Sequence, residues 1–152
     1  MKQTTLCYLE QDGKYLMLHR TKKQNDINHD KWIGVGGKFE AGETPEQCML
    51  REVWEETGFI VTKWKYRGIV VFYLDEQYGE EMHLFTCMEW SGKQKVCDEG
   101  DLAWIDKRKL AELPMWEGDA IFLNLVNNPD EPFFKLKLVY HGDTLISSER
   151  IV

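Results

Sequence analysis

Three glutamates near the middle of the chain have the spacing that places carboxylates on one face of a helix. Glu52, Glu55 and Glu56 occupy positions i, i+3 and i+4. At about 100° per residue they fall within an arc of roughly 100°. Carboxylates so close together repel one another, so their grouping adds no stability by itself. An all-oxygen cluster suits a hard cation, which favours Mg²⁺ or Mn²⁺ over zinc or copper.

A cation held in this way would act on phosphates. Magnesium keeps several of its waters and shares its coordination sphere with substrate phosphates, so it polarises a phosphate and lowers the pKa of a bound water. The three glutamates alone also allow an ordinary alternative, a solvated acidic face, because glutamates are common on exposed helices.

The segment that would carry these acids has clear helix boundaries. Thr44 is a candidate N-cap, Pro45 suits the first helical position, and Gln47 completes a capping box. Gly58 would end the helix as a left-handed C-cap. The sequence therefore predicts a helix between Thr44 and Gly58.

The other face of this predicted helix is apolar, so we expect it to pack on a sheet while the acidic face lines a cleft. Its apolar residues are Met49, Leu50, Val53 and Trp54. The preceding segment, Trp32–Phe39, is rich in glycine, so its backbone can approach a ligand closely. The segment before it, Thr21–Lys31, is polar and indicates a surface loop.

The rest of the chain alternates between strand patterns and turn residues. Asp119 is a candidate N-cap for a second helix over Ala120–Asn127, which Pro129 follows. This mixture of strands with about two helices favours an α/β sandwich. The predicted strands are Thr4–Glu10, Tyr15–Arg20, Ile60–Arg67, Gly68–Leu74, Met82–Trp90, Leu102–Ile105, Phe133–Tyr140 and Thr144–Arg150.

The acidic helix is part of a longer pattern of fixed positions. After Gly37 come, at defined intervals, Glu43, Arg51, Glu52, Val53, Glu55, Glu56, Gly58 and Phe59. This pattern is similar at every defined position to the Nudix box, a far more specific signal than a lone glycine motif. Weaker similarity extends from Leu16–Arg20 to Met115-Trp116. The chain thus resembles the Nudix hydrolases, and within them the MutT-type oxidised-purine nucleoside triphosphatases.

The resemblance implies a fold and a reaction for the single domain expected over residues 1–152. The fold would be the Nudix α/β/α sandwich around a mixed β-sheet. The reaction would be attack of water on a phosphorus of a nucleoside diphosphate derivative. A nucleoside triphosphate would then give the monophosphate and pyrophosphate, and 8-oxo-dGTP is a candidate substrate.

The resemblance also assigns roles to individual residues. Glu52, Glu55 and Glu56 match the metal ligands of the family, with Mg²⁺ as the expected cofactor and Mn²⁺ as a substitute. A backbone carbonyl at Gly36 or Gly37 would complete the coordination. Glu55 or Glu56 would also orient or deprotonate the attacking water.

Further residues match supporting positions. Arg51 and Glu43 match an ion pair that braces the loop and the helix. Glu99 resembles an additional acid that some members use as a metal ligand or base, and the alternative for Glu99 is an ordinary loop acid.

Three basic residues are candidates to bind the substrate. Arg20 and Lys23 are candidates to contact its phosphates, and Lys38 follows the glycine pair of the box. Lys23 lies in the polar segment, so the alternative for it is a solvated lysine.

A tryptophan followed closely by acids reads the base in the oxidised-purine branch, and Trp116 and Asp119 resemble that arrangement. Two positions depart from it, because Gly118 stands where an acid is expected and Ile33 where some members have a base-contacting asparagine. Both departures remove hydrogen-bonding groups that would discriminate between bases. The alternative for Trp116 is a core aromatic.

Other functions stay open at this point. One is a Nudix module that senses a nucleotide without hydrolysing it, although such a module has no need to keep all three acids. Another is hydrolysis of dinucleoside polyphosphates or ADP-ribose. The ADP-ribose and NADH branches often carry prolines after the box, and none lies between Pro45 and Pro114.

Composition narrows the partners. The 152 residues carry a net charge of −7, which argues against nucleic-acid binding. No apolar run approaches the roughly 18 residues of a membrane span. The first residues lack a signal-peptide core, so the cytosol is the expected compartment. We therefore expect a small-molecule nucleotide as the partner, no nucleic acid, no membrane, and a monomer or homodimer.

The cysteines and histidines do not have the spacing of a zinc site. We expect the cysteines to be reduced and mostly buried. They are Cys7, Cys48, Cys87 and Cys97.

Overall fold

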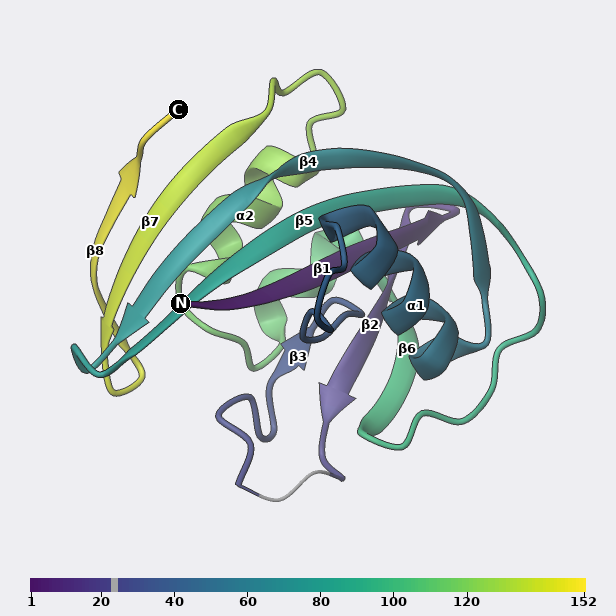
Figure 1. Ribbon diagram of the computed structural model, residues 1–152, viewed down its shortest axis with the longest axis horizontal. Coiled ribbons are helices and arrows are strands. Elements are labelled where there is room, and N and C mark those ends of the chain that lie inside the picture. The colour runs from purple at the N-terminus through teal and green to yellow at the C-terminus, as the bar shows by residue number, and fades with distance from the viewer. Residues whose placement is uncertain (23–24) are drawn as a thin grey trace.

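The strands form one mixed sheet with a helix on each side, as predicted (Figure 1). The computed structural model describes residues 1–22 and 25–152. Its elements are β1 (Lys2–Gln11), β2 (Lys14–Arg20), β3 (Trp32–Ile33), α1 (Pro45–Thr57), β4 (Ile60–Leu74), β5 (Tyr78–Ser91), β6 (Gly100–Asp106), the 3₁₀ helix η1 (Lys107–Glu112), α2 (Asp119–Val126), β7 (Phe134–His141) and β8 (Thr144–Arg150).

The sheet runs in the order β3-β2-β1-β5-β4-β7-β8, and β6 pairs with β2. The β1–β5 and β4–β7 pairs are parallel, and the other pairs are antiparallel. The parallel pair at the centre places the start of β1 beside the start of β5, with Thr4 opposite Met82. The first residues of the chain therefore lie in the middle of the molecule and take part in its main cavity.

Alternation along β1 divides the interior into two cores, because successive side chains of a strand point to opposite faces. Leu6 and Tyr8 belong to the core that contains Phe122 of α2. Cys7 belongs to the other core, which contains Met49 of α1. The two helices thus cover opposite faces of the sheet, giving the α/β/α layers (Figure 1).

Helix α1 begins and ends as predicted. The Thr44 hydroxyl accepts a hydrogen bond from Gln47 N at 3.1 Å, and the Gln47 side chain accepts one from Thr44 N at 3.0 Å. Gly58 follows in the left-handed conformation with φ of 82°. The prediction for Trp54 was wrong, because this side chain is 53% exposed. The sheet-facing position is filled by Val53, and one residue later the helix has turned by about 100° toward solvent.

Strand β4 replaces two predicted strands. The sequence suggested a break between Arg67 and Gly68, but the structure has one strand with register shifts, one of them between Tyr66 and Gly68. A β-bulge bends a strand without ending it, so a glycine there does not require a turn.

The prediction of Asp119 as an N-cap was also wrong. Gly118 is the N-cap, without a side-chain cap hydrogen bond, and Asp119 is the first residue of α2 with its side chain buried. A cap side chain has to fold back over the first turn, whereas Asp119 lines a cavity.

The C-terminal end of α2 is held by a buried arginine from β4. The Arg67 guanidinium donates hydrogen bonds to the carbonyls of Val126 at 2.9 Å and Asn128 at 2.6 Å. A cation at this position also interacts favourably with the helix dipole. Arg67 therefore joins the end of α2 to the sheet, in addition to the packing of α2 in the core.

The segment before β3 is more than a surface loop. Asp26 has only 6% of its side chain exposed and pairs with Arg20, with 2.8 Å between Nε and Oδ2. Lys23, a candidate phosphate ligand, lies outside the described residues. The four cysteines are free and buried, as predicted. Within residues 1–22 and 25–152, no helix is long and apolar enough to cross a membrane.

Candidate active site

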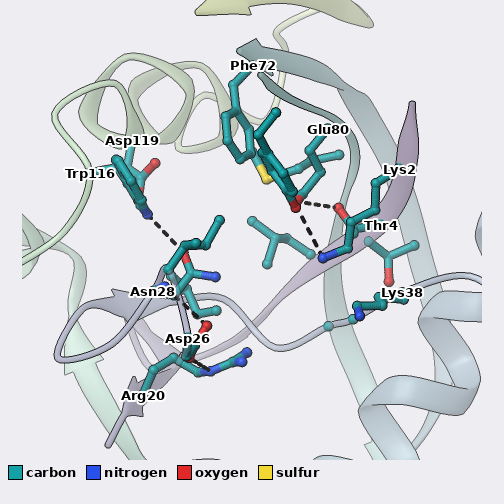
Figure 2. Close-up of a pocket in the computed structure, with 18 of the residues that line it drawn as sticks. Lys2, Thr4, Arg20, Asp26, Asn28, Lys38, Phe72, Glu80, Trp116 and Asp119 are labelled. Atoms are coloured by element: carbon teal, nitrogen blue, oxygen red, sulfur yellow. Dashed lines mark hydrogen bonds and ion pairs between the residues drawn. The ribbon is translucent and has the colours of Figure 1, made fainter. Parts of the chain in front are cut away.

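One cavity of about 490 Å³ joins the acidic face of α1 to an aromatic wall beside α2. Glu52, Glu99 and the glycine pair Gly36-Gly37 line one end. Trp116 lines the other end, next to Asp119 (Figure 2). A volume of this size is within the usual range for a small-molecule site.

Glu52 is the glutamate of α1 that faces the cavity. Its side chain is mostly buried, and burial raises the pKa of its carboxyl while the hydrogen bond from Arg51 opposes that rise. A Cβ on Gly37 would lie 2.5 Å from the Glu52 carboxylate. Only a glycine at position 37 leaves space beside the carboxylate, so the backbone forms a cradle there.

Glu56 lies deeper, with 6% of its surface exposed. Its Oε2 accepts a hydrogen bond from Gly36 N at 3.0 Å, while its Oε1 is buried and has no partner among the described residues. Burial raises the pKa of Glu56 well above its ordinary value, and the neighbouring carboxyls of Glu99 and Glu52 raise it further. A buried oxygen without a partner is costly, so a cation or a hydrogen-bond donor placed at Glu56 Oε1 would stabilise the site.

Glu55 points elsewhere. Its side chain is 47% exposed and is bound by Arg51 at 3.1 Å, and it does not line the cavity. The structure therefore brings Glu52, Glu56 and Glu99 together and leaves Glu55 outside this group.

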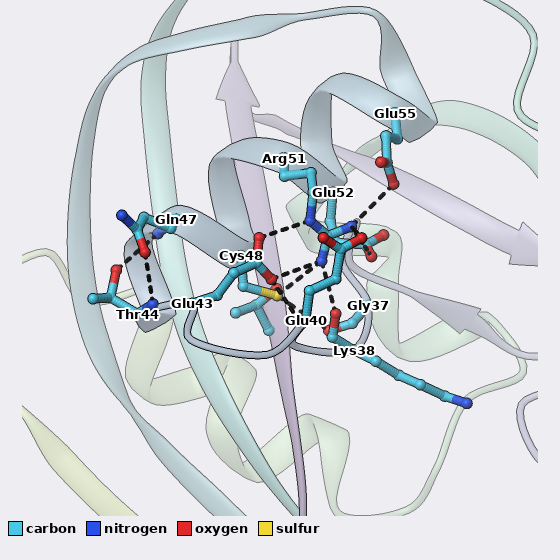
Figure 3. Close-up of polar contacts among 11 residues, drawn as sticks. Gly37, Lys38, Glu40, Glu43, Thr44, Gln47, Cys48, Arg51, Glu52 and Glu55 are labelled. Carbon is cyan, nitrogen blue, oxygen red and sulfur yellow. Dashed lines mark hydrogen bonds and ion pairs between the residues drawn. The ribbon is translucent and has the colours of Figure 1, made fainter.

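Arg51 is the centre of the charge network on α1 (Figure 3). It donates to Glu43 at 2.7 and 2.9 Å, the ion pair that the sequence predicted, and this pairing lowers the pKa of Glu43 to about 2. It also binds Glu52 at 2.8 Å and the carbonyl of Lys38 at 2.9 Å. One guanidinium thus ties the loop after the glycines to the helix.

No ready-made cluster of three metal-binding side chains occurs in residues 1–22 and 25–152. The physical reason is that Arg51 occupies oxygens of Glu52 and Glu55, and Gly36 N occupies one oxygen of Glu56. Even so, the orphaned Glu56 oxygen and the space beside Glu52 fit a cation that takes oxygen ligands.

Arg20 lies between the two ends of the cavity. It is buried and bridges Asp26 to Glu99, whose carboxylate is 3.4 Å from Nη1. Lys38 also lines the cavity. Both cations are therefore within reach of an anionic ligand, although Arg20 already has two carboxylate partners.

Trp116 combines the two roles that the sequence left open. It packs in the core against Tyr140, and it also lines the cavity. Its indole Nε1 donates to Asn28 Oδ1 at 2.8 Å, and the Lys31 ammonium lies 4.5 Å from the ring centroid. The ring is thus held rigidly as a flat surface for stacking.

Asp119 is buried beside Trp116, and this burial raises the pKa of its carboxyl to about 8. Near neutral pH this group is mostly protonated, so it can donate a hydrogen bond. The structure explains why position 118 is a glycine. The Gly118 N–H donates to the Tyr140 hydroxyl at 2.8 Å, and a Cβ at this position would lie 2.6 Å from that oxygen. An acidic side chain at 118 would require Tyr140 to move.

Several cavity residues were missed in the sequence because they come from separate segments. Asn28 lies in the polar loop, and Thr4 and Glu80 lie on neighbouring strands whose pairing is parallel. No spacing rule links such positions, and only the alternation of β1 hinted that Thr4 shares a face with Leu6.

Known proteins share both the sequence pattern and the fold. Residues 2–126 match the NUDIX domain family. An oxidized purine nucleoside triphosphate hydrolase from Danio rerio is 32% identical over 82% of this chain and 79% of its own length. The uncharacterized Nudix hydrolase YvcI of Bacillus subtilis is 28% identical over 83% and 79%. The crystal structure of the mutator MutT protein from Bacillus halodurans superposes with a TM-score of 0.86 at 29% identity, covering 99% and 98% of the two chains.

Proposed function

The chain belongs to the NUDIX domain family, as a MutT-type hydrolase, and from this premise we propose that it cleaves nucleoside triphosphates to the monophosphate and pyrophosphate. The proposal names an oxidised purine nucleotide such as 8-oxo-dGTP as substrate and Mg²⁺ as the cofactor, with Mn²⁺ able to replace it.

The observation that carries the proposal is the continuity of the cavity. A nucleotide has a flat apolar base at one end and a chain of anionic phosphates at the other. The cavity offers Trp116 at one end and the carboxylates with the glycine pair at the other. The acids repel phosphates unless a cation lies between them, which supports a metal-dependent reaction.

The residues that would hold the metal are the acids at the α1 end. Glu52, Glu56 and Glu99 would supply carboxylate oxygens, and Gly36 would supply a backbone carbonyl. The carbonyl of Gly37 already accepts a hydrogen bond from Thr5 N at 2.9 Å, which favours Gly36 for this role. When bound, the cation would polarise a phosphate and lower the pKa of a water.

The chain's own groups then position the reactants. Glu56 Oε1 has no competing donor, so it is available to a water or a cation in the site. The exposed Glu55 would orient or deprotonate the attacking water if Arg51 releases it. Arg20 and Lys38 would bind phosphate oxygens, and Lys23 remains a candidate for the same task.

Trp116 and Asp119 would receive the base. The indole ring offers a stacking surface, and the neutral Asp119 carboxyl offers a donor and an acceptor side by side. The Danio rerio relative named for oxidised purine nucleoside triphosphates supports a purine substrate.

A substrate panel tests the proposal. The protein is incubated with Mg²⁺ and 8-oxo-dGTP, the four ordinary dNTPs, ADP-ribose or diadenosine polyphosphates, and the products are separated. We expect monophosphate and pyrophosphate from a purine triphosphate, and no product when EDTA removes the metal. Turnover of ADP-ribose alone would overturn the substrate class, and tight binding without any turnover would identify a sensor.

A further inference from the structure

A second carboxylate lies in the part of the cavity that would hold the base. Glu80 of β5 is only 8% exposed, yet it lines the cavity. Figure 2 shows it across the cavity from Trp116 and Asp119, with Lys2 and Thr4 next to it. A buried charged group needs hydrogen-bond partners, and because Glu80 borders the cavity, a ligand there can supply some of them.

Two hydroxyl groups hold this carboxylate in place. Thr4 donates to Oε2 at 2.8 Å, and Tyr78 donates to Oε1 at 2.5 Å. Burial, followed by the hydrogen bond to Glu80, raises the pKa of Tyr78, so the phenol stays protonated and remains the donor. The Lys2 ammonium lies 3.9 Å from Oε1 and supplies a nearby positive charge.

The hydrogen bonds from Thr4 and Tyr78 hold the Glu80 carboxylate in one orientation as a hydrogen-bond acceptor. An ionised carboxylate has about four lone-pair positions and no donor. The two hydroxyls use one position on each oxygen, so each oxygen can accept one more hydrogen bond. The ligand group that fits best has two neighbouring N–H donors.

Among the common bases, only guanine has such an edge. Its N1–H and its 2-amino group lie side by side, and oxidation at C8 leaves both unchanged. Adenine and cytosine place one amino group next to an acceptor nitrogen, and hypoxanthine lacks the 2-amino group.

A base-recognising group at Glu80 would also compensate for the hydrogen-bonding side chains that positions 118 and 33 lack. Position 118 is a glycine because Tyr140 fills its space, and Ile33 presents only hydrocarbon to the cavity. Discrimination between bases depends on buried hydrogen bonds, so the cavity needs polar groups elsewhere.

We propose that Glu80 is a specificity-determining residue that accepts hydrogen bonds from N1–H and the 2-amino group of a guanine-type base. This inference rests on the proposed function and narrows its substrate class to guanine nucleotides, oxidised or not. Thr4 and Tyr78 act as positioning residues for the carboxylate.

Calorimetric titration with nucleoside monophosphates tests this without turnover. The wild-type protein should bind dGMP about tenfold or more tightly than dIMP, which lacks only the 2-amino group, because a hydrogen bond to a charged group has an effect of this size. Equal affinities for dGMP and dIMP in the wild type would overturn the proposal, whatever a variant does.

The variant Glu80→Gln keeps the shape and replaces one acceptor by a donor. Its preference for dGMP over dIMP should shrink to less than about threefold, and dAMP should gain relative to dGMP because an amide matches an acceptor beside a donor. The matched control is Glu81→Gln, the next residue of β5, which bonds Gln3 and does not line the cavity. An unchanged base preference in a folded Glu80→Gln variant would also overturn the proposal.

A parallel measurement of pyrophosphate release separates this inference from the proposed function. Turnover of triphosphates without dependence on Glu80 would reject only the role of Glu80. Binding of dGMP without turnover of any triphosphate would reject the hydrolase and keep the base specificity. Failure to bind any nucleotide would reject both.

Discussion

The two ends of the cavity differ in how their carboxyl groups are paired. At the α1 end, Glu52 and Glu56 are crowded with Glu99, and one buried oxygen has no partner. At the base end, Glu80 has two hydroxyl donors, and the buried Asp119 carboxyl has a pKa raised to about 8. At the α1 end one carboxylate oxygen is thus left without a partner among the described residues, whereas at the other end the polar groups are already paired.

Under the proposed function, this difference assigns catalysis to the α1 end and base recognition to the other end. Under the proposed function, the crowded acids would be stabilised by binding a cation, and the reaction would depend on it. An end with fixed hydrogen bonds selects a ligand by shape and by the placement of donors and acceptors. Variants of the two ends should therefore fail in different ways.

The largest expected effect comes from the acidic end. Glu56→Gln or Glu55→Gln should reduce kcat by about 10²-fold or more, because metal and general-base effects have that size. The affinity for a nucleoside monophosphate should stay unchanged, since the base end is intact. Pyrophosphate release and calorimetric titration measure the two quantities, and Glu46→Gln in the first turn of α1 serves as the control. Wild-type rates in both variants would remove these residues from the mechanism.

Adding metal should have the next largest effect, and only at the acidic end. In the proposed site Mg²⁺ would bind only the folded state and relieve repulsion between carboxylates, so at 100 times its Kd it should stabilise the protein by about 2.7 kcal/mol. Differential scanning calorimetry with and without Mg²⁺ shows this as a higher Tm. The same Tm at saturating Mg²⁺ would contradict a metal site in this cavity.

The Arg51 network should respond to a change of shape at constant charge. Arg51→Lys keeps the positive charge but cannot reach Glu43, Glu52 and the Lys38 carbonyl at once, so it should cost about 2 kcal/mol of stability. Urea unfolding measures the change. The control is Arg108→Lys, whose exposed side chain pairs with Asp106 and should leave the midpoint unchanged. Equal effects in the two variants would show that Arg51 is an ordinary surface residue.

The affinity for a purine nucleotide should depend on pH through Asp119 at the base end. Since the pKa of Asp119 is raised to about 8, its carboxyl is protonated below that pH and ionised above it. Purine affinity should be full below pH 8 and fall by about tenfold per unit above it if the proton is donated to the base. Titrations from pH 6 to pH 9.5 measure this, and Asp119→Asn should flatten the profile.

The raised pKa of Asp119 also predicts the direction in which the free energy of unfolding changes with pH. The folded state keeps a proton that the unfolded chain releases near pH 4, so the Asp119 contribution to stability is largest at low pH and falls as pH rises from about 4 to about 8. The difference in unfolding free energy between wild type and Asp119→Asn should follow this direction. A difference that grows in favour of the wild type with rising pH would contradict the buried, neutral carboxyl.

The acidic end was largely predictable because it is local in sequence. The capping residues Thr44 and Gln47 and the spacing of Glu52, Glu55 and Glu56 fix a helix and one of its faces. Local periodicity could not decide how far each side chain is buried, so Trp54 and Glu55 ended up exposed.

The base end depends on long-range pairing and was only partly predictable. Trp116 meets Asn28 across 88 positions of the chain, and Thr4 meets Glu80 across 76. Such contacts follow from the parallel pairing of β1 with β5 and from the docking of α2, which residue patterns do not specify. The prediction of Asp119 as a helix cap failed for the same reason, because the docking of α2 buries its side chain in the cavity wall.

Arg67 has a consequence for how base preference could change. It ties the C-terminus of α2 to β4, while the first residue of α2 is Asp119 in the base end of the cavity. A small shift of the helix along its axis would therefore move Asp119 relative to the ligand, although no residue lining the cavity had been substituted. On the proposed function, a substitution at Arg67, remote from the ligand, would therefore change the base preference and leave the acids of α1 where they are.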